Sequence, residues 1–94
     1  MKTTAKYPKI RNVSPKPGKT LLVTFDNGDS RLYDCKPLLD KEVFRPLREE
    51  AIFRCAHADS HGHGVVWNDD IDLAESEIWL NGKFTEPDDA LDKQ

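Results

Sequence analysis

A chain of 94 residues is long enough for one domain with one modest core, because domains run from roughly 50 to 250 residues. Hydrophobic residues make up 37%, charged residues 33%, and the formal net charge is −3, which indicates a polar globular protein and excludes disorder throughout. No run approaches the roughly 18 apolar residues of a transmembrane helix, and the N-terminal MKTTAKYPKI lacks the apolar core of a signal peptide. We therefore expect no membrane contact and a cytoplasmic location.

Positive charge is concentrated at the N-terminus. The first 20 residues hold six lysine or arginine side chains and no carboxylate, so they carry +6 and residues 21–94 carry −9. We expect residues 1–9 to form a basic arm. Such an arm can steer a protein toward nucleic acid or an acidic partner. Its lysines can also be solvated and simply neutralise the acidic surface of the domain, which is the interpretation we prefer.

A β-hairpin is the first predicted element. Residues 26–29, DNGD, contain Asn-Gly, a strong hairpin signal because a type I′ turn needs two residues that tolerate positive φ. Antiparallel strands are predicted at residues 20–25 and 30–35 on either side of it. The stretch TLLVTF places alternate apolar side chains on one face, as a half-buried strand requires. Residues 10–14 are predicted to add a third strand at one edge.

Short helices are predicted after this hairpin. Lys36–Asp40 is predicted to form a helical turn opened by its proline. In VFRPLREEAIF, apolar residues recur at helical spacing, and Pro46 fits only a first turn, so a helix is predicted from residue 45 or 46 to residue 51. Cys35 and Cys55 are expected to be free thiols, because the chain shows no secretory signal.

A second hairpin is predicted over about residues 53–67, with its turn at residues 59–64. Residues 69–73 then lead into a helix over residues 74–80, whose early acids suit a helix N-terminus, with Gly82 as its C-terminal cap. The acidic, proline-broken residues 83–94 are expected to be a disordered tail. Residues 10–82 are thus predicted to form a single α+β domain, an antiparallel sheet of four to five strands (two hairpins) with two short helices packed on it.

Several short motifs, taken in order, resemble domain-of-unknown-function family 2442. They are V-x-P-x-P-x-x-x-L-x-V-x-F-x-N-G at residues 13–28, Y-D at 33–34, P-L-L at 37–39, V-F-R-P-L at 43–47, Phe53, and V-V-W-N-D-D-I-D-L with I-W within residues 65–79. The resemblance implies a small bacterial α+β domain, sometimes followed by a helix-turn-helix DNA-binding domain and sometimes encoded beside another small domain in arrangements like toxin and antitoxin pairs. It implies no established enzymatic activity and no agreed active-site residues.

This chain departs from that family pattern in two ways. It ends too soon for a helix-turn-helix domain, so we do not expect direct DNA readout by one. It also has a histidine-rich turn where such members usually have a plain polar one.

The histidine-rich stretch FRCAHADSHGHGVVW, residues 53–67, is the strongest candidate for a chemical site. If residues 53–59 form a strand, Cys55 lies near the core on the same face as His57 and Asp59. Zinc needs three or four ligands, and His57, Asp59, His61 and His63 could supply three of them. Their spacing lacks the paired ligands of known zinc motifs, and no oxyanion element accompanies Cys55 and His57. We therefore assign no metal, no cofactor and no catalytic residue, and expect an exposed polar turn.

The function favoured by these observations is a non-enzymatic binding module that acts through a protein partner, as the antitoxin-like or accessory component of a two-gene unit. The expected contacts are an exposed sheet edge or the surface around Trp79 with Glu75 and Glu77, because aromatic anchors carry much of the energy of interfaces. The basic arm with Lys9 and Arg11 is the second choice.

Two other functions stay open. One is a metal-dependent or thiol-dependent site at Cys55, His57, His61 and His63. The other is weak nucleic-acid binding by the N-terminal arm, with an affinity that falls steeply with salt.

Overall fold

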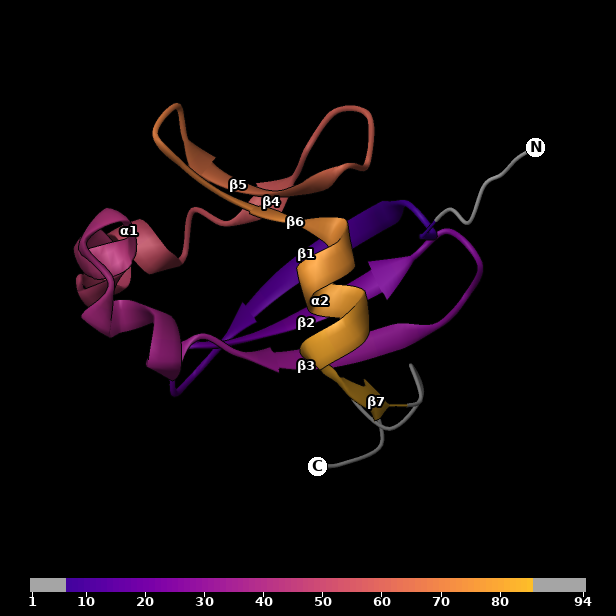
Figure 1. Ribbon diagram of the computed structural model, residues 1–94, viewed down its shortest axis with the longest axis horizontal. Helices are drawn as coiled ribbons and strands as arrows, with labels where there is room; N and C mark the ends of the chain where they lie inside the picture. The colour runs from indigo at the N-terminus through magenta and orange to yellow at the C-terminus, as the bar shows by residue number, and fades with distance from the viewer. Residues whose placement is uncertain (1–6, 86–94) are drawn as a thin grey trace.

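The computed structural model describes residues 7–85 and has two antiparallel sheets (Figure 1). The larger has the order β1-β2-β3-β7 and the smaller β4-β5-β6. Along the chain the elements are β1 (Ile10–Lys16), β2 (Thr20–Phe25), β3 (Ser30–Asp34), η1 (Lys36–Asp40), η2 (Glu42–Arg48), α1 (Glu50–Phe53), β4 (His57–Ala58), β5 (Gly64–Asn68), β6 (Ile71–Ala74), α2 (Glu75–Asn81) and β7 (Lys83–Thr85). The predicted α+β class is confirmed, although the strands divide between two sheets.

The predicted first hairpin is confirmed, but its turn is not type I′. Gly28 has a φ of 94°, whereas Asn27 is not among the residues with positive φ. The turn is closed by the Phe25 amide, which donates to the Asp29 carbonyl at 2.8 Å, and by the Gly28 amide, which donates to the Phe25 carbonyl at 3.0 Å. A single residue with positive φ is enough for this longer turn, and glycine supplies it without steric cost. The edge strand β1 is also confirmed and runs two residues further than predicted.

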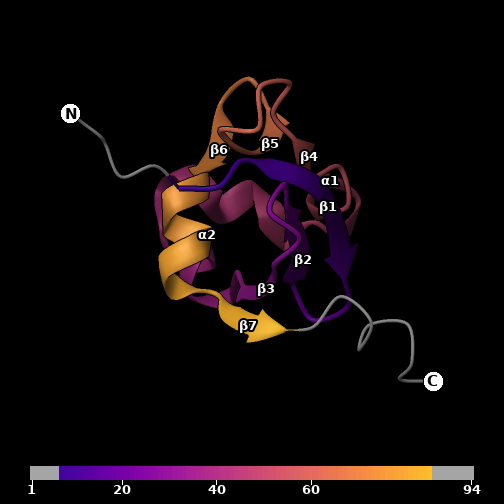
Figure 2. The ribbon, with the colours of Figure 1, turned by 90° about the vertical axis from the view of Figure 1, so that its right-hand side faces the viewer.

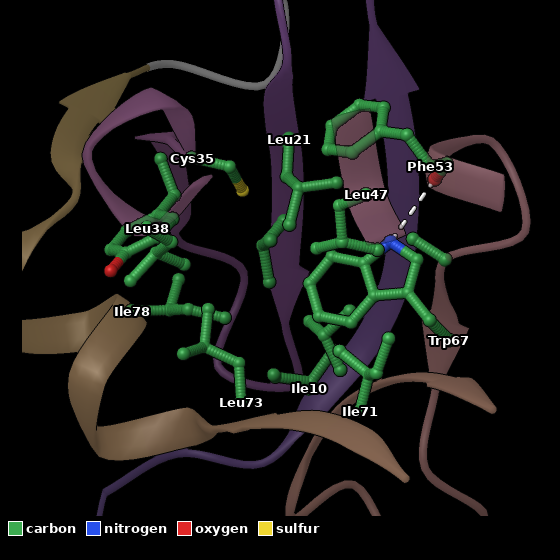
Figure 3. Close-up of a cluster of buried hydrophobic side chains, with 14 of the residues drawn as sticks. Ile10, Leu21, Cys35, Leu38, Leu47, Phe53, Trp67, Ile71, Leu73 and Ile78 are labelled. Atoms are coloured by element: carbon green, nitrogen blue, oxygen red, sulfur yellow. Dashed lines mark hydrogen bonds between the residues drawn. The ribbon is translucent and has the colours of Figure 1, made fainter. Parts of the chain in front are cut away.

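The core lies between the inner face of the larger sheet and the elements that cover it. Leu21, Val23 and Phe25 of β2 are fully buried, as the alternation predicts. Figure 2 shows β1, β2, β3 and β7 curving around one side of the molecule, with α2 and the smaller sheet on the other sides. Figure 3 shows side chains from both sheets and from the helices converging in this core. There the Trp67 indole Nε1 donates to the Phe53 carbonyl at 3.1 Å.

The prediction of a single helix from residue 45 or 46 to residue 51 is wrong. A 3₁₀ helix, η2, covers Glu42–Arg48 with Pro46 inside it, and the extended Glu49 separates it from α1. A proline inside an α-helix removes one backbone hydrogen bond and clashes with the preceding turn. The chain therefore uses two short helical segments, and each buries one apolar side chain, Leu47 and Phe53. The turn predicted at Lys36–Asp40 is confirmed as the 3₁₀ helix η1.

The second hairpin is shorter than predicted, because Phe53 ends α1 and does not begin a strand. In the first half of this hairpin only His57–Ala58 forms a strand, β4, and it pairs with β5. Ile71–Ala74, predicted only as a lead-in to the helix, pairs with the other side of β5 as the third strand of the smaller sheet. The expected disordered tail is also corrected at its start, since Lys83–Thr85 pairs with β3 as β7. The domain thus extends past residue 82, whereas most of the predicted arm and residues 86–94 lie outside the described residues.

Candidate functional site

The histidine-rich turn is organised by Asp59. One carboxylate oxygen of Asp59 accepts hydrogen bonds from the backbone amides of His61 at 2.8 Å and His63 at 3.3 Å. These amides lower the pKa of the Asp59 carboxyl, because they stabilise its charged form. The His61 and His63 rings of this turn stack with their centroids 6.0 Å apart, and both side chains are exposed. Asp59 therefore holds the backbone of a tight turn.

The same turn packs against the beginning of β1. The Gly62 carbonyl accepts a hydrogen bond from the Ile10 amide at 2.8 Å, and Gly62 has a φ of 77°. A Cβ at Gly62 would lie 2.8 Å from the Lys9 Cβ, so only glycine fits there without a shift. Asp59 holds the backbone of the turn and Gly62 joins the turn to β1, so both residues have a structural role.

The structure does not bring the predicted metal candidates together. Among residues 7–85, no three His, Cys, Asp or Glu side chains lie close enough to hold a metal ion. His57 directs Nδ1 to the Cys55 carbonyl at 2.9 Å, whereas the His61 ring stacks on His63 and places its Nδ1 3.3 Å from the Ser60 hydroxyl. A metal-dependent site at this hairpin therefore has no geometric support in the described part of the chain.

The two cysteines are free thiols, as expected, but Cys35 is buried and Cys55 is exposed. Cys55 is exposed and follows α1, with its thiol donating to the Ala51 carbonyl at 3.4 Å, so its predicted place near the core is wrong. The reason is that the chain here leaves a helix and is not a strand. Cys35 is fully buried, and this burial raises the pKa of its thiol to about 12, which keeps it protonated at neutral pH.

Glu77 and Trp79, two of the predicted partner contacts on α2, contact other residues of the domain. The Tyr33 hydroxyl donates to a Glu77 carboxylate oxygen at 2.8 Å, and burial together with this carboxylate raises the Tyr33 pKa. The half-buried Trp79 packs edge-on against Phe25, with ring centroids 5.1 Å apart. Glu75 begins α2, where its amide donates to the His63 carbonyl at 3.1 Å. Glu77 and Trp79 therefore fix α2 on the larger sheet.

An arginine connects Trp79 to the last strand. The Arg31 guanidinium lies 3.9 Å from the centre of the Trp79 ring and 5.4 Å from the centre of the Phe84 ring. Its Nε also donates to the Trp79 carbonyl at 3.3 Å. A guanidinium between two aromatic rings restrains all three side chains, since cation–π attraction adds to their packing. Trp79 and Phe84 are thus held in place within the domain.

Two large apolar side chains are exposed close to this stack. Leu80, in the last turn of α2, is 63% exposed, and Phe84, in β7, is 62% exposed. We call the group of Trp79, Leu80 and Phe84 the α2–β7 surface. It is a candidate protein-binding surface, because exposed aromatic and aliphatic groups on a rigid support are typical of interface anchors.

The strand in this surface lies at a sheet edge. In the described part of the chain, β7 pairs with β3 on one side and with no strand on the other. Beside it is a hollow of about 390 Å³, lined by Thr20, Leu32, Asp34, Lys36, Asn81 and Lys83. An edge strand exposes backbone donors and acceptors that an incoming strand can pair with.

The predicted second surface consists of Arg11, in β1, and Lys9, just before this strand. The Arg11 side chain is exposed, as is Lys9, whose backbone amide donates to an Asp26 carboxylate oxygen at 3.3 Å. Most of the basic arm, residues 1–6, lies outside the described residues. Lys9 and Arg11 are therefore available to a partner but belong to a different element from the α2–β7 surface.

Sequence analysis missed Leu80 and Phe84 as candidate contacts. The prediction named Trp79 on the helix, and it assigned Phe84 to the tail. One signal was available, because Lys-Phe-Thr places an aromatic between two polar residues, as a short strand would. Three residues are too few for that alternation to be decisive.

The comparisons with known proteins agree with the extent of this domain. No curated protein and no solved structure shows significant similarity to the chain. The model of one protein family matches residues 10–84, which include both sheets and end within β7. The family carries no assigned activity, and the predicted resemblance is confirmed: the chain belongs to the family described as "Protein of unknown function (DUF2442)".

Proposed function

We propose that this protein is a non-enzymatic binding module that recognises a protein partner through the α2–β7 surface. The observation that carries the proposal is the exposure of Leu80, in the last turn of α2, and of Phe84 in β7, whose second edge pairs with no strand among residues 7–85. Burying such side chains against a partner is favourable by about 25 cal/mol for each Å² of apolar surface.

The support beneath this surface makes it suited to binding. Phe84 rests against Arg31, and Arg31 against Trp79, so the anchor loses little conformational freedom when a partner covers it. Val43 is also 53% exposed, but it lies on η2 and belongs to no strand. It therefore provides a matched control for exposed apolar area.

The non-enzymatic part of the proposal is supported by the positions of the reactive side chains. The Cys35 thiol is buried and protonated, and the exposed Cys55 accompanies a histidine that bonds to backbone. An antitoxin-like or accessory role in a bacterial two-gene unit is the finer proposal, and it depends on the family resemblance. Within residues 7–85, no helix is long and apolar enough to cross a membrane.

The test is affinity capture from the host that encodes the chain, followed by binding measurements with the purified partner. Wild type and Val43→Asp are expected to capture the same stoichiometric partner, whereas Leu80→Asp and Phe84→Asp are expected to lose it while remaining folded by circular dichroism. Equal capture by all four proteins would reject the α2–β7 surface. Absence of any stoichiometric partner for the wild type would reject the binding module.

A further inference from the structure

We propose that the partner binds as an extended segment that adds a strand to β7 and that alternates apolar with acidic side chains. This inference rests on the proposed function and names the chemistry of the partner. It follows from the two different faces that β7 presents along its free edge.

The register of β7 on β3 defines these two faces. Lys83 pairs with Leu32, and Thr85 with Ser30, while Phe84 between them pairs with Arg31. Paired residues of antiparallel strands point to the same face of a sheet. Phe84 therefore points to the face that carries α2, and Lys83 points to the opposite face, where it lines the hollow with Leu32.

An added strand must follow the same alternation. Its side chains on the α2 face meet the exposed Phe84, so this half of the segment is apolar. Its side chains on the other face meet Lys83, which is exposed and makes no ion pair among residues 7–85. Lys36 also lines this hollow, although Asp34 holds it at 3.4 Å. Because Asp34 lines the hollow too and offsets Lys36, the charge that an added strand meets is that of Lys83. An acidic side chain complements Lys83, and a lysine is repelled by it.

Backbone hydrogen bonds supply the remaining affinity. Strand addition to an exposed edge takes its affinity from main-chain pairing and its specificity from alternate side chains. Because β7 has only three residues, the pairing is short and the anchors on both faces are needed. A helix packed on Leu80 and Phe84 would use the same apolar groups without backbone pairing, so the two modes can be separated.

The probes are three fluorescein-labelled, end-blocked peptides of seven residues, measured by fluorescence anisotropy. The first alternates valine with glutamate, the second alternates valine with lysine, and the third is the first with N-methylated backbone amides. We expect the glutamate peptide to bind about tenfold more tightly than the lysine peptide, because attraction replaces repulsion at Lys83. We expect the N-methylated peptide to lose binding.

Matched variants test the assignment to β7. Lys83→Glu is expected to reverse the preference between the first two peptides, whereas Lys41→Glu, at an exposed lysine between η1 and η2, is expected to leave it unchanged. Equal affinity for the two peptides, undiminished binding of the N-methylated peptide, or no binding of any peptide at about 1 mM would overturn the inference. Capture of a partner that still depends on Leu80 and Phe84 would then leave the proposed function standing.

Discussion

Replacing Tyr33 with phenylalanine tests whether Glu77 fixes the fold or serves a partner. The Tyr33 ring is only 6% exposed, and its hydroxyl donates to the Glu77 carboxylate at 2.8 Å. The bond joins β3 to α2, so it helps to hold the helix that carries Leu80. Tyr33→Phe retains the buried ring and removes this bond.

The expected cost follows from the geometry. Hydrogen bonds to charged groups contribute about 1.5–3 kcal/mol, but the freed Glu77 carboxylate is half-buried and regains water in the variant. We therefore expect the free energy of unfolding to fall by about 1–1.5 kcal/mol. For a domain of this size that corresponds to a melting temperature lower by roughly 5–10 °C.

Urea unfolding followed by circular dichroism measures this change, and a double-mutant cycle with Glu77→Gln isolates the pair. The single variants are expected to destabilise by similar amounts, and the double variant by less than their sum. A Tyr33→Phe effect below about 0.3 kcal/mol with additive single effects would refute the reasoning, since it would mean that the bond contributes nothing in solution.

Three other outcomes are expected. Gly62→Ala should lower the free energy of unfolding by about 2 kcal/mol or more, because an alanine at positive φ costs about 1–2 kcal/mol and its Cβ meets the Lys9 Cβ at 2.8 Å. Gly18→Ala, also at positive φ but with open space around it, should cost less in the same urea titration. Equal costs would contradict the packing of Gly62 against β1. A thiol-reactive dye at pH 8 should modify the exposed Cys55 rapidly and the buried Cys35 only after denaturation, so fast modification of two thiols in the native protein would contradict the buried position. The folded-state pKa of Asp59 is depressed, so the stability that this carboxylate contributes is present above the unfolded pKa of about 3.9 and is lost as the pH falls through the folded pKa. The wild type should therefore lose more stability in acid than Asp59→Asn. Identical acid titrations of the two proteins would count against the role of Asp59 in holding the turn.

Local signals in the sequence were sufficient for the first half of the fold. Alternation in β2, the glycine at residue 28 and the proline of η1 each act within a few residues, and all three elements form where predicted. The position of Cys55 was predicted wrongly, because it depended on the type of element to which the residue belongs. The prediction extended a strand back to Phe53, whereas the helix α1 occupies that position and turns Cys55 outward.

The α2–β7 surface could not be predicted from the sequence, because it is formed by contacts between distant parts of the chain. The sequence by itself determined the α+β class and the family. Only the tertiary structure decided that Glu77 bonds to Tyr33 and that the half-buried Trp79 packs on Phe25, while Leu80 and Phe84 remain exposed. These environments depend on where α2 packs against the larger sheet. A strand of three residues such as β7 has too little periodicity of its own, and it becomes a strand because β3 offers it an edge to pair with.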